Sequence, residues 1–139
     1  MNRFATMCVA FALTLAACAS TPEGQKVQFQ ALVKIGAQAA LEEGELSAAD
    51  LGELAGKLES MASKADEGQV DVDFGSLGAL VNKSLGWQGY KAAGVELVLM
   101  QADVMLADQG VVLDGVVLDV GAYSAWLKVA AKGVRQAIP

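Results

Sequence analysis

The chain has 139 residues, of which 54% are apolar and only 6% aromatic, with 16 acids against 10 bases and no histidine. This balance excludes the basic surface that nucleic-acid binding needs and the commonest general base, and it argues against zinc, copper or iron centres. The two prolines, Pro22 and Pro139, leave all the residues between them free to be helical, so we expect one small helical domain rich in Ala, Leu and Gly.

The first segment in chain order is an apolar run that follows a single positive charge. Arg3 precedes residues 4–17, which are apolar apart from two threonines, and two alanines end the run directly before Cys18. At about 1.5 Å per residue a helix of this length falls short of a hydrocarbon core about 30 Å thick. The order of these features predicts a cleaved export signal over residues 1–17. An uncleaved anchor, or an ordinary signal with Cys18 as a small buried residue, is the competing interpretation.

The end of the run, Leu15-Ala16-Ala17-Cys18, resembles the lipobox of bacterial lipoprotein precursors. The resemblance implies that the Cys18 thiol receives a diacylglyceryl group, that the chain is cut before Cys18 and that the new amino group is acylated. Two or three acyl chains hold a protein firmly on a bilayer. Residues 18–24 are then a short tether to the domain.

Cleavage would also change the charge and the cysteine content of the mature chain. Loss of Arg3 changes the formal net charge from −6 to −7, and Cys8 leaves with the signal. The one remaining cysteine, Cys18, is the lipid attachment site, so no disulfide can form. Ala19 stands where aspartate favours the inner membrane in enterobacterial lipoproteins, and this favours the outer membrane.

Residues 25–43 are predicted to form the first helix of a single domain that covers residues 25–139. Apolar residues recur there at steps of three and four, and small residues such as Gly36 would let another helix approach closely. Gly44 ends this helix.

The second predicted helix has the clearest start signal in the sequence. Ser47 is its N-cap and Asp50 completes a variant capping box, because Glu or Gln is the usual partner. About 20 residues follow, ending before Gly68, with one regular apolar stripe: Leu51, Leu54, Ala55, Leu58, Met61, Ala62 and Ala65.

The next two helices are predicted over residues 74–85 and 87–109. Asp73 would cap the shorter one, and Gly86 would end it in the left-handed conformation. The longer one is apolar nearly all round, which predicts a position in the middle of the bundle, with Met100 and Met105 as core fillers.

The chain from Gly110 to Gly121 changes pattern. Val-Val-Leu-Asp is repeated around Gly115, and valine-rich runs on both sides of Asp114-Gly115 favour a β-hairpin over a broken helix. Asp119 would cap a final helix. The predicted fold is therefore mainly α, a bundle of four or five helices with this hairpin as an addition.

Charge is distributed unevenly, with acids concentrated in residues 42–73 and bases in the last helix. The acids could be a docking surface for a basic partner or simply a solvated helix face. The docking interpretation selects five of them: Glu42, Glu43, Glu45, Glu53 and Glu59.

No residue set in the sequence predicts catalysis, a metal or a cofactor. Glu96 and Asp103 stand out as acids in an apolar helix, where pairing with lysine or facing solvent is favoured over binding a cation or polar ligand. We expect a membrane-anchored accessory protein that contacts the membrane through its lipid and binds another envelope protein, not nucleic acid. A carrier with a lipid or small-ligand pocket in the bundle, and a phage- or plasmid-encoded surface lipoprotein, are the alternatives.

Overall fold

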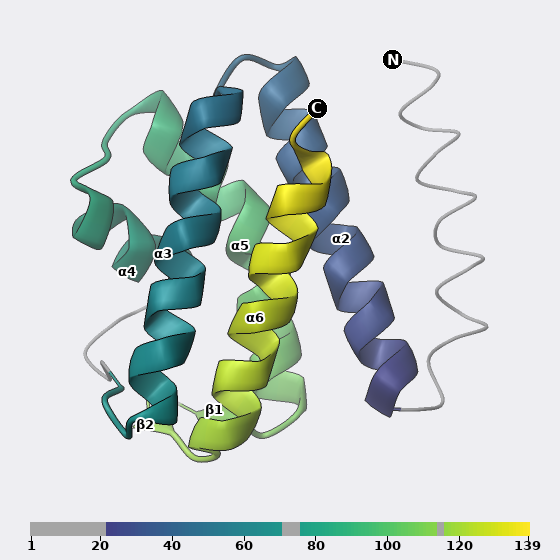
Figure 1. Ribbon diagram of the computed structural model, residues 1–139, viewed down its shortest axis with the longest axis vertical. Coiled ribbons are helices and arrows are strands. Elements are labelled where there is room, and N and C mark those ends of the chain that lie inside the picture. Colours follow the sequence, from purple (N-terminus) through teal and green to yellow (C-terminus); the bar gives the residue numbers. More distant parts are fainter. Residues whose placement is uncertain (1–21, 71–75, 114–115) are drawn as a thin grey trace.

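The computed structural model describes residues 22–70, 76–113 and 116–139, which form a mainly helical bundle (Figure 1). The predicted fold class is therefore confirmed. In chain order the elements are α2 (Pro22–Glu42), α3 (Ala48–Asp66), α4 (Leu77–Leu85), α5 (Tyr90–Asp108), β1 (Val112–Leu113), β2 (Val116–Val117) and α6 (Val120–Ala137).

The helices contact one another in a ring. α6 lies between α3 and α2, α2 also contacts α5, and the short α4 contacts both α5 and α3. Figure 1 shows α3, α6 and α2 side by side, with α5 behind them and α4 at one edge. The largest fully buried side chains come from around this ring and form one core: Phe29, Leu46, Leu51, Leu54, Leu58, Leu77, Leu99 and Leu127.

The helix ends predicted at Ser47, Gly86 and Asp119 are confirmed. The Ser47 hydroxyl accepts the Asp50 N–H at 3.1 Å, and the Asp50 carboxylate accepts the Ser47 N–H at 3.0 Å, which closes the capping box. Gly86 ends α4 with φ 69°, and the Asp119 carboxylate accepts the Ala122 N–H to start α6. Local sequence therefore sets these boundaries.

Three helices begin at other residues than predicted. α2 already begins at Pro22, in keeping with the preference of proline for the first turn, so the last residues of the predicted tether are helical. α4 begins at Leu77 with Ser76 as its N-cap, whereas Asp73, the predicted cap, lies outside the described residues. α5 begins only at Tyr90, after Gly89 at φ 67°.

Two short antiparallel strands follow α5. Val112 pairs with Val117 and Leu113 pairs with Val116, and the Leu118 N–H donates to the Val111 carbonyl at 2.7 Å. The hairpin is therefore confirmed for its strands, while Asp114 and Gly115 themselves lie outside the described residues.

Close approach at three glycines holds the helices together. A Cβ on Gly36 of α2 would lie 3.3 Å from the Val98 Cα of α5, and a Cβ on Gly78 of α4 would lie 3.0 Å from the Glu96 Cα on the same helix. At Gly133 of α6 the corresponding distance, to the Gln30 carbonyl oxygen of α2, is only 2.6 Å. These contacts confirm that small residues let the helices pack at short range.

We expect Gly133→Ala to lower the free energy of unfolding by about 1–3 kcal/mol, the usual cost of overpacking, because the new methyl group would push α6 away from the α2 backbone. Gly56→Ala on α3 is the matched control. It has open space around it, so it should raise stability by up to about 1 kcal/mol through helix propensity. Urea denaturation gives the free energy of unfolding of both variants and of the parent. Equal stabilisation by both substitutions would show that α2 and α6 are not packed this closely.

Candidate interaction surface

α5 does not lie in the middle of the bundle, contrary to the prediction. Its buried side faces the core, whereas Leu97, Met100 and Val104 are 50%, 52% and 50% exposed. The assignment of Met100 as a core filler is therefore wrong, while Met105 does pack against the core.

The reason for this exposure lies in how α5 is held. α4 contacts α5 at Glu96 and α2 contacts it at Val98. Residues two apart in a helix are about 160° apart around its axis by the shorter arc, so the two neighbours hold α5 from nearly opposite sides. Leu97 lies between these two contacts on the side away from the core. The described part of the chain supplies no further helix to cover that side.

The exposed apolar residues of α5 have a regular spacing. Ala93, Leu97, Met100, Val104 and Ala107 are all exposed and follow one another at steps of four, three, four and three residues. We call these five residues the α5 apolar stripe. This is the spacing of the apolar positions of a coiled coil, in which they form a narrow seam along one side of the helix.

The margins of the α5 apolar stripe are acidic. Glu96 is exposed beside it, Asp108 is exposed at its C-terminal end, and Glu45 from the α2–α3 turn lies against Gly94. Lys91 is the one base in α5, and its ammonium bonds the Asp50 carboxylate at 2.9 Å.

Asp50 therefore has two structural roles, of which the sequence revealed only the capping box. Burial would raise the pKa of its carboxyl, but the Ser47 N–H and the Lys91 ammonium together hold that pKa below its ordinary value. Lys91 also lies 5.4 Å from the Trp87 ring centre. The ion pair ties α3 to the start of α5.

Asp103 has a role that neither interpretation of this residue anticipated. Its carboxylate accepts the Leu77 N–H at 2.8 Å, so a side chain of α5 satisfies a backbone donor in the first turn of α4. Burial raises the pKa of Asp103 above its ordinary value, against a smaller opposing effect of the Leu77 N–H. The contact between two helices left no signal in the local sequence.

The five predicted docking acids do not lie on one face. Glu53 and Glu59 are six residues apart on α3, about 120° around the helix axis. Glu59 bonds Arg135 of α6, while Glu42 and Glu43 are exposed where α2 ends. Only Glu45 reaches the margin of the α5 apolar stripe.

A second acid on α3 is also bonded to α6. Asp66 bonds the Lys128 ammonium at 2.9 Å and lies 2.5 Å from the Ser124 hydroxyl. The Ser124 hydroxyl and the Lys128 ammonium lower the pKa of Asp66. The Asp66–Lys128 and Glu59–Arg135 pairs both join α3 to α6. Some acids of residues 42–73 and some bases of the last helix therefore pair with each other inside the domain.

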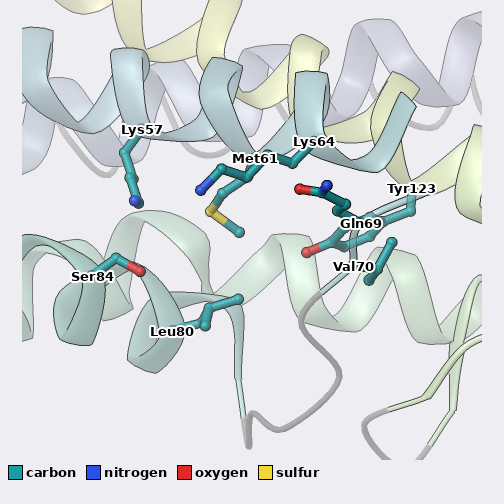
Figure 2. Close-up of a pocket in the computed structure, with 8 residues that line it drawn as sticks. All are labelled: Lys57, Met61, Lys64, Gln69, Val70, Leu80, Ser84 and Tyr123. Carbon is teal, nitrogen blue, oxygen red and sulfur yellow. The ribbon is translucent and has the colours of Figure 1, made fainter. Parts of the chain in front are cut away.

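A small pocket lies between α3, α4 and the start of α6 (Figure 2). Figure 2 shows Lys57 and Met61 extending from α3 toward α4, which contributes Leu80 and Ser84, while Lys64 runs along α3. Its volume is about 90 Å³, well below the roughly 300–1,000 Å³ of typical small-molecule sites. The pocket has no room for an acyl chain.

In residues 22–70, 76–113 and 116–139, no three acids or cysteines gather closely enough to hold a metal ion. Within the same ranges, no helix has the length and apolar character to cross a membrane.

The fold and surface together define a small helical bundle with one half-exposed apolar helix. No protein-family model, curated protein or solved structure matches the chain.

The raised pKa of Asp103 predicts a specific pH dependence of stability. The folded state holds this proton more tightly than the unfolded state, so stability should fall as the pH rises from the ordinary value of 3.8 through the raised pKa. Asp103→Asn should remove that part of the slope while keeping an acceptor for the Leu77 N–H. Asp103→Leu should cost about 1–3 kcal/mol, because it leaves that donor unsatisfied. Urea denaturation between pH 4 and 7 tests this; parallel curves for parent and Asn variant would contradict it.

Proposed function

We propose that this chain is a bacterial lipoprotein, anchored in the cell envelope through Cys18, that acts by binding another protein and carries out no catalysis. The observation that carries the binding role is the α5 apolar stripe. Leu97, Met100 and Val104 are each about half exposed and form a continuous row. A continuous apolar row is typical of an interaction surface, whereas single exposed apolar residues are common on any protein.

The position of α2 sets how far the domain would lie from the bilayer when anchored through Cys18. Because α2 begins at Pro22, only three residues, Ala19 to Thr21, separate the acylated cysteine from the first helix. Fully extended, the four Cα-to-Cα steps from Cys18 to Pro22 span at most about 13–14 Å. The start of α2 would therefore stay close to the bilayer. Ala19, in place of an aspartate after the acylated cysteine, favours the outer membrane.

The acids with shifted pKa support a non-catalytic role. Asp50, Asp66 and Asp103 each bond a group of a neighbouring helix, and those bonds account for their positions. Perturbed acids in an active site instead lie together in a cleft.

The carrier alternative receives less support. The pocket in Figure 2 holds only about 90 Å³, several times less than a lipid or drug-sized ligand needs. A larger hollow of about 440 Å³ beside Glu59, Lys132 and Arg135 is open to solvent and lined mostly by charged and polar side chains, unlike the apolar pocket of a carrier. The apolar surface that α5 offers lies on the outside of the bundle. An interaction role uses that surface directly, whereas a carrier would have to open the core.

Cys18→Ser tests the anchor, and Cys8→Ser is the matched control. We expect Cys18→Ser to abolish labelling by radioactive palmitate and to release the protein from the membrane fraction, because the thiol that carries the lipid is gone. Cys8→Ser should leave both properties unchanged. Sucrose-gradient separation of inner and outer membranes then locates the lipidated form. Unchanged labelling of Cys18→Ser would exclude the proposed anchor.

A further inference from the structure

We propose that the α5 apolar stripe binds an amphipathic helix of another protein, one with the same four-three apolar spacing and with Lys or Arg beside that seam. This inference names the partner chemistry for the binding role proposed above and rests on it.

The shape of the surface favours a helix as the partner. The α5 apolar stripe runs over 15 residues from Ala93 to Ala107, and these 14 residue steps correspond to about 21 Å of helix and two heptads. Its members lie within a narrow arc between the α4 contact at Glu96 and the α2 contact at Val98. A narrow straight seam matches the row of side chains on one helix, since helices in grooves are recognised through anchors at such spacing.

The charge around the surface favours a basic partner. Glu45, Glu96 and Asp108 lie along its margins, and the nearest base on the same helix, Lys91, is already bonded to Asp50. Lys or Arg next to the seam of the incoming helix would meet these carboxylates, as oppositely charged flanking residues do in coiled coils. Such pairs select the partner and speed association more than they add affinity.

The same charges argue against two other occupants. If two copies paired through α5, Glu96 and Asp108 would meet acids of the other copy, because α5 has no free base to offer. Anionic lipid headgroups would be repelled in the same way, whereas surfaces that bind such lipids carry clusters of Lys and Arg.

A pair of designed peptides tests the inference with the protein as purified from cells, in phosphatidylcholine nanodiscs when it carries lipid and in solution when it does not. Both peptides are two- to three-heptad helices with leucine at the seam; one carries lysine at the flanking positions and the other glutamate. Fluorescence anisotropy should show binding of the lysine peptide, weakened at high salt, and at least about tenfold weaker binding of the glutamate peptide, equivalent to about 1.4 kcal/mol.

Variants of the protein then locate the binding surface. Leu97→Gln with Val104→Gln should weaken binding of the lysine peptide at least about tenfold, while both side chains are exposed enough for the fold to persist. Leu118→Gln, at an exposed apolar residue next to the hairpin, is the matched control and should bind as the parent does. Glu96→Gln with Asp108→Asn should remove most of the preference for lysine over glutamate. Circular dichroism checks that each variant remains folded.

Several results would overturn the inference. Equal binding of the two peptides, or no loss with the Leu97 and Val104 substitutions, would exclude a charge-selected helix on this surface. A polarity-sensitive dye on Met100→Cys that reports lipid without peptide would assign the surface to the bilayer, and a dimeric mass lost in the same double variant would assign it to a second copy. Because peptide binding does not depend on where the cell places the protein, it can fail while the Cys18 test succeeds, or the reverse.

Discussion

The structure depends first on how closely α6 and α2 can approach one another. At Gly133 a single added carbon would lie 2.6 Å from the Gln30 carbonyl oxygen, which is closer than two such atoms can come. This approach brings Phe29 against Trp126, with ring centres 5.0 Å apart and planes at 80°. A chain with few aromatic residues can therefore fill its core with short side chains, because its helix backbones are close together.

The same kind of contact sets the position of α5. Gly36 and Gly78 let α2 and α4 approach it from nearly opposite sides, and Asp103 then bonds the first turn of α4. These contacts fix which part of a nearly all-apolar helix faces the core. The residues left outside are consequently as apolar as many buried ones. Exposure of Leu97, Met100 and Val104 follows from the packing of the neighbours rather than from any polarity of α5 itself.

How far the sequence predicted this structure depends on the distance over which each signal acts. The Ser47 capping box, the Gly86 end and the Asp119 cap involve neighbouring residues, so they were readable directly. The Asp103–Leu77 and Asp50–Lys91 bonds join residues 26 and 41 positions apart, and no local pattern encodes them. Periodicity likewise failed for α5, because a helix that is apolar all round has no preferred side until its neighbours are placed.

The charged residues of α5 bear on the partner-binding role proposed above. A fully buried helix would have to neutralise Glu96 and Asp108, yet both remain exposed, while Asp103 and Lys91 are bonded within the domain. Of the three acids of α5, the two whose carboxylates make no bond among the described residues, Glu96 and Asp108, are thus the ones beside the α5 apolar stripe. An uncovered apolar row costs solubility, and bordering it with like charges opposes both self-association and attraction to anionic lipid. Under the proposed binding role, a complementary basic helix is the occupant that would gain from both the apolar row and its acidic margins.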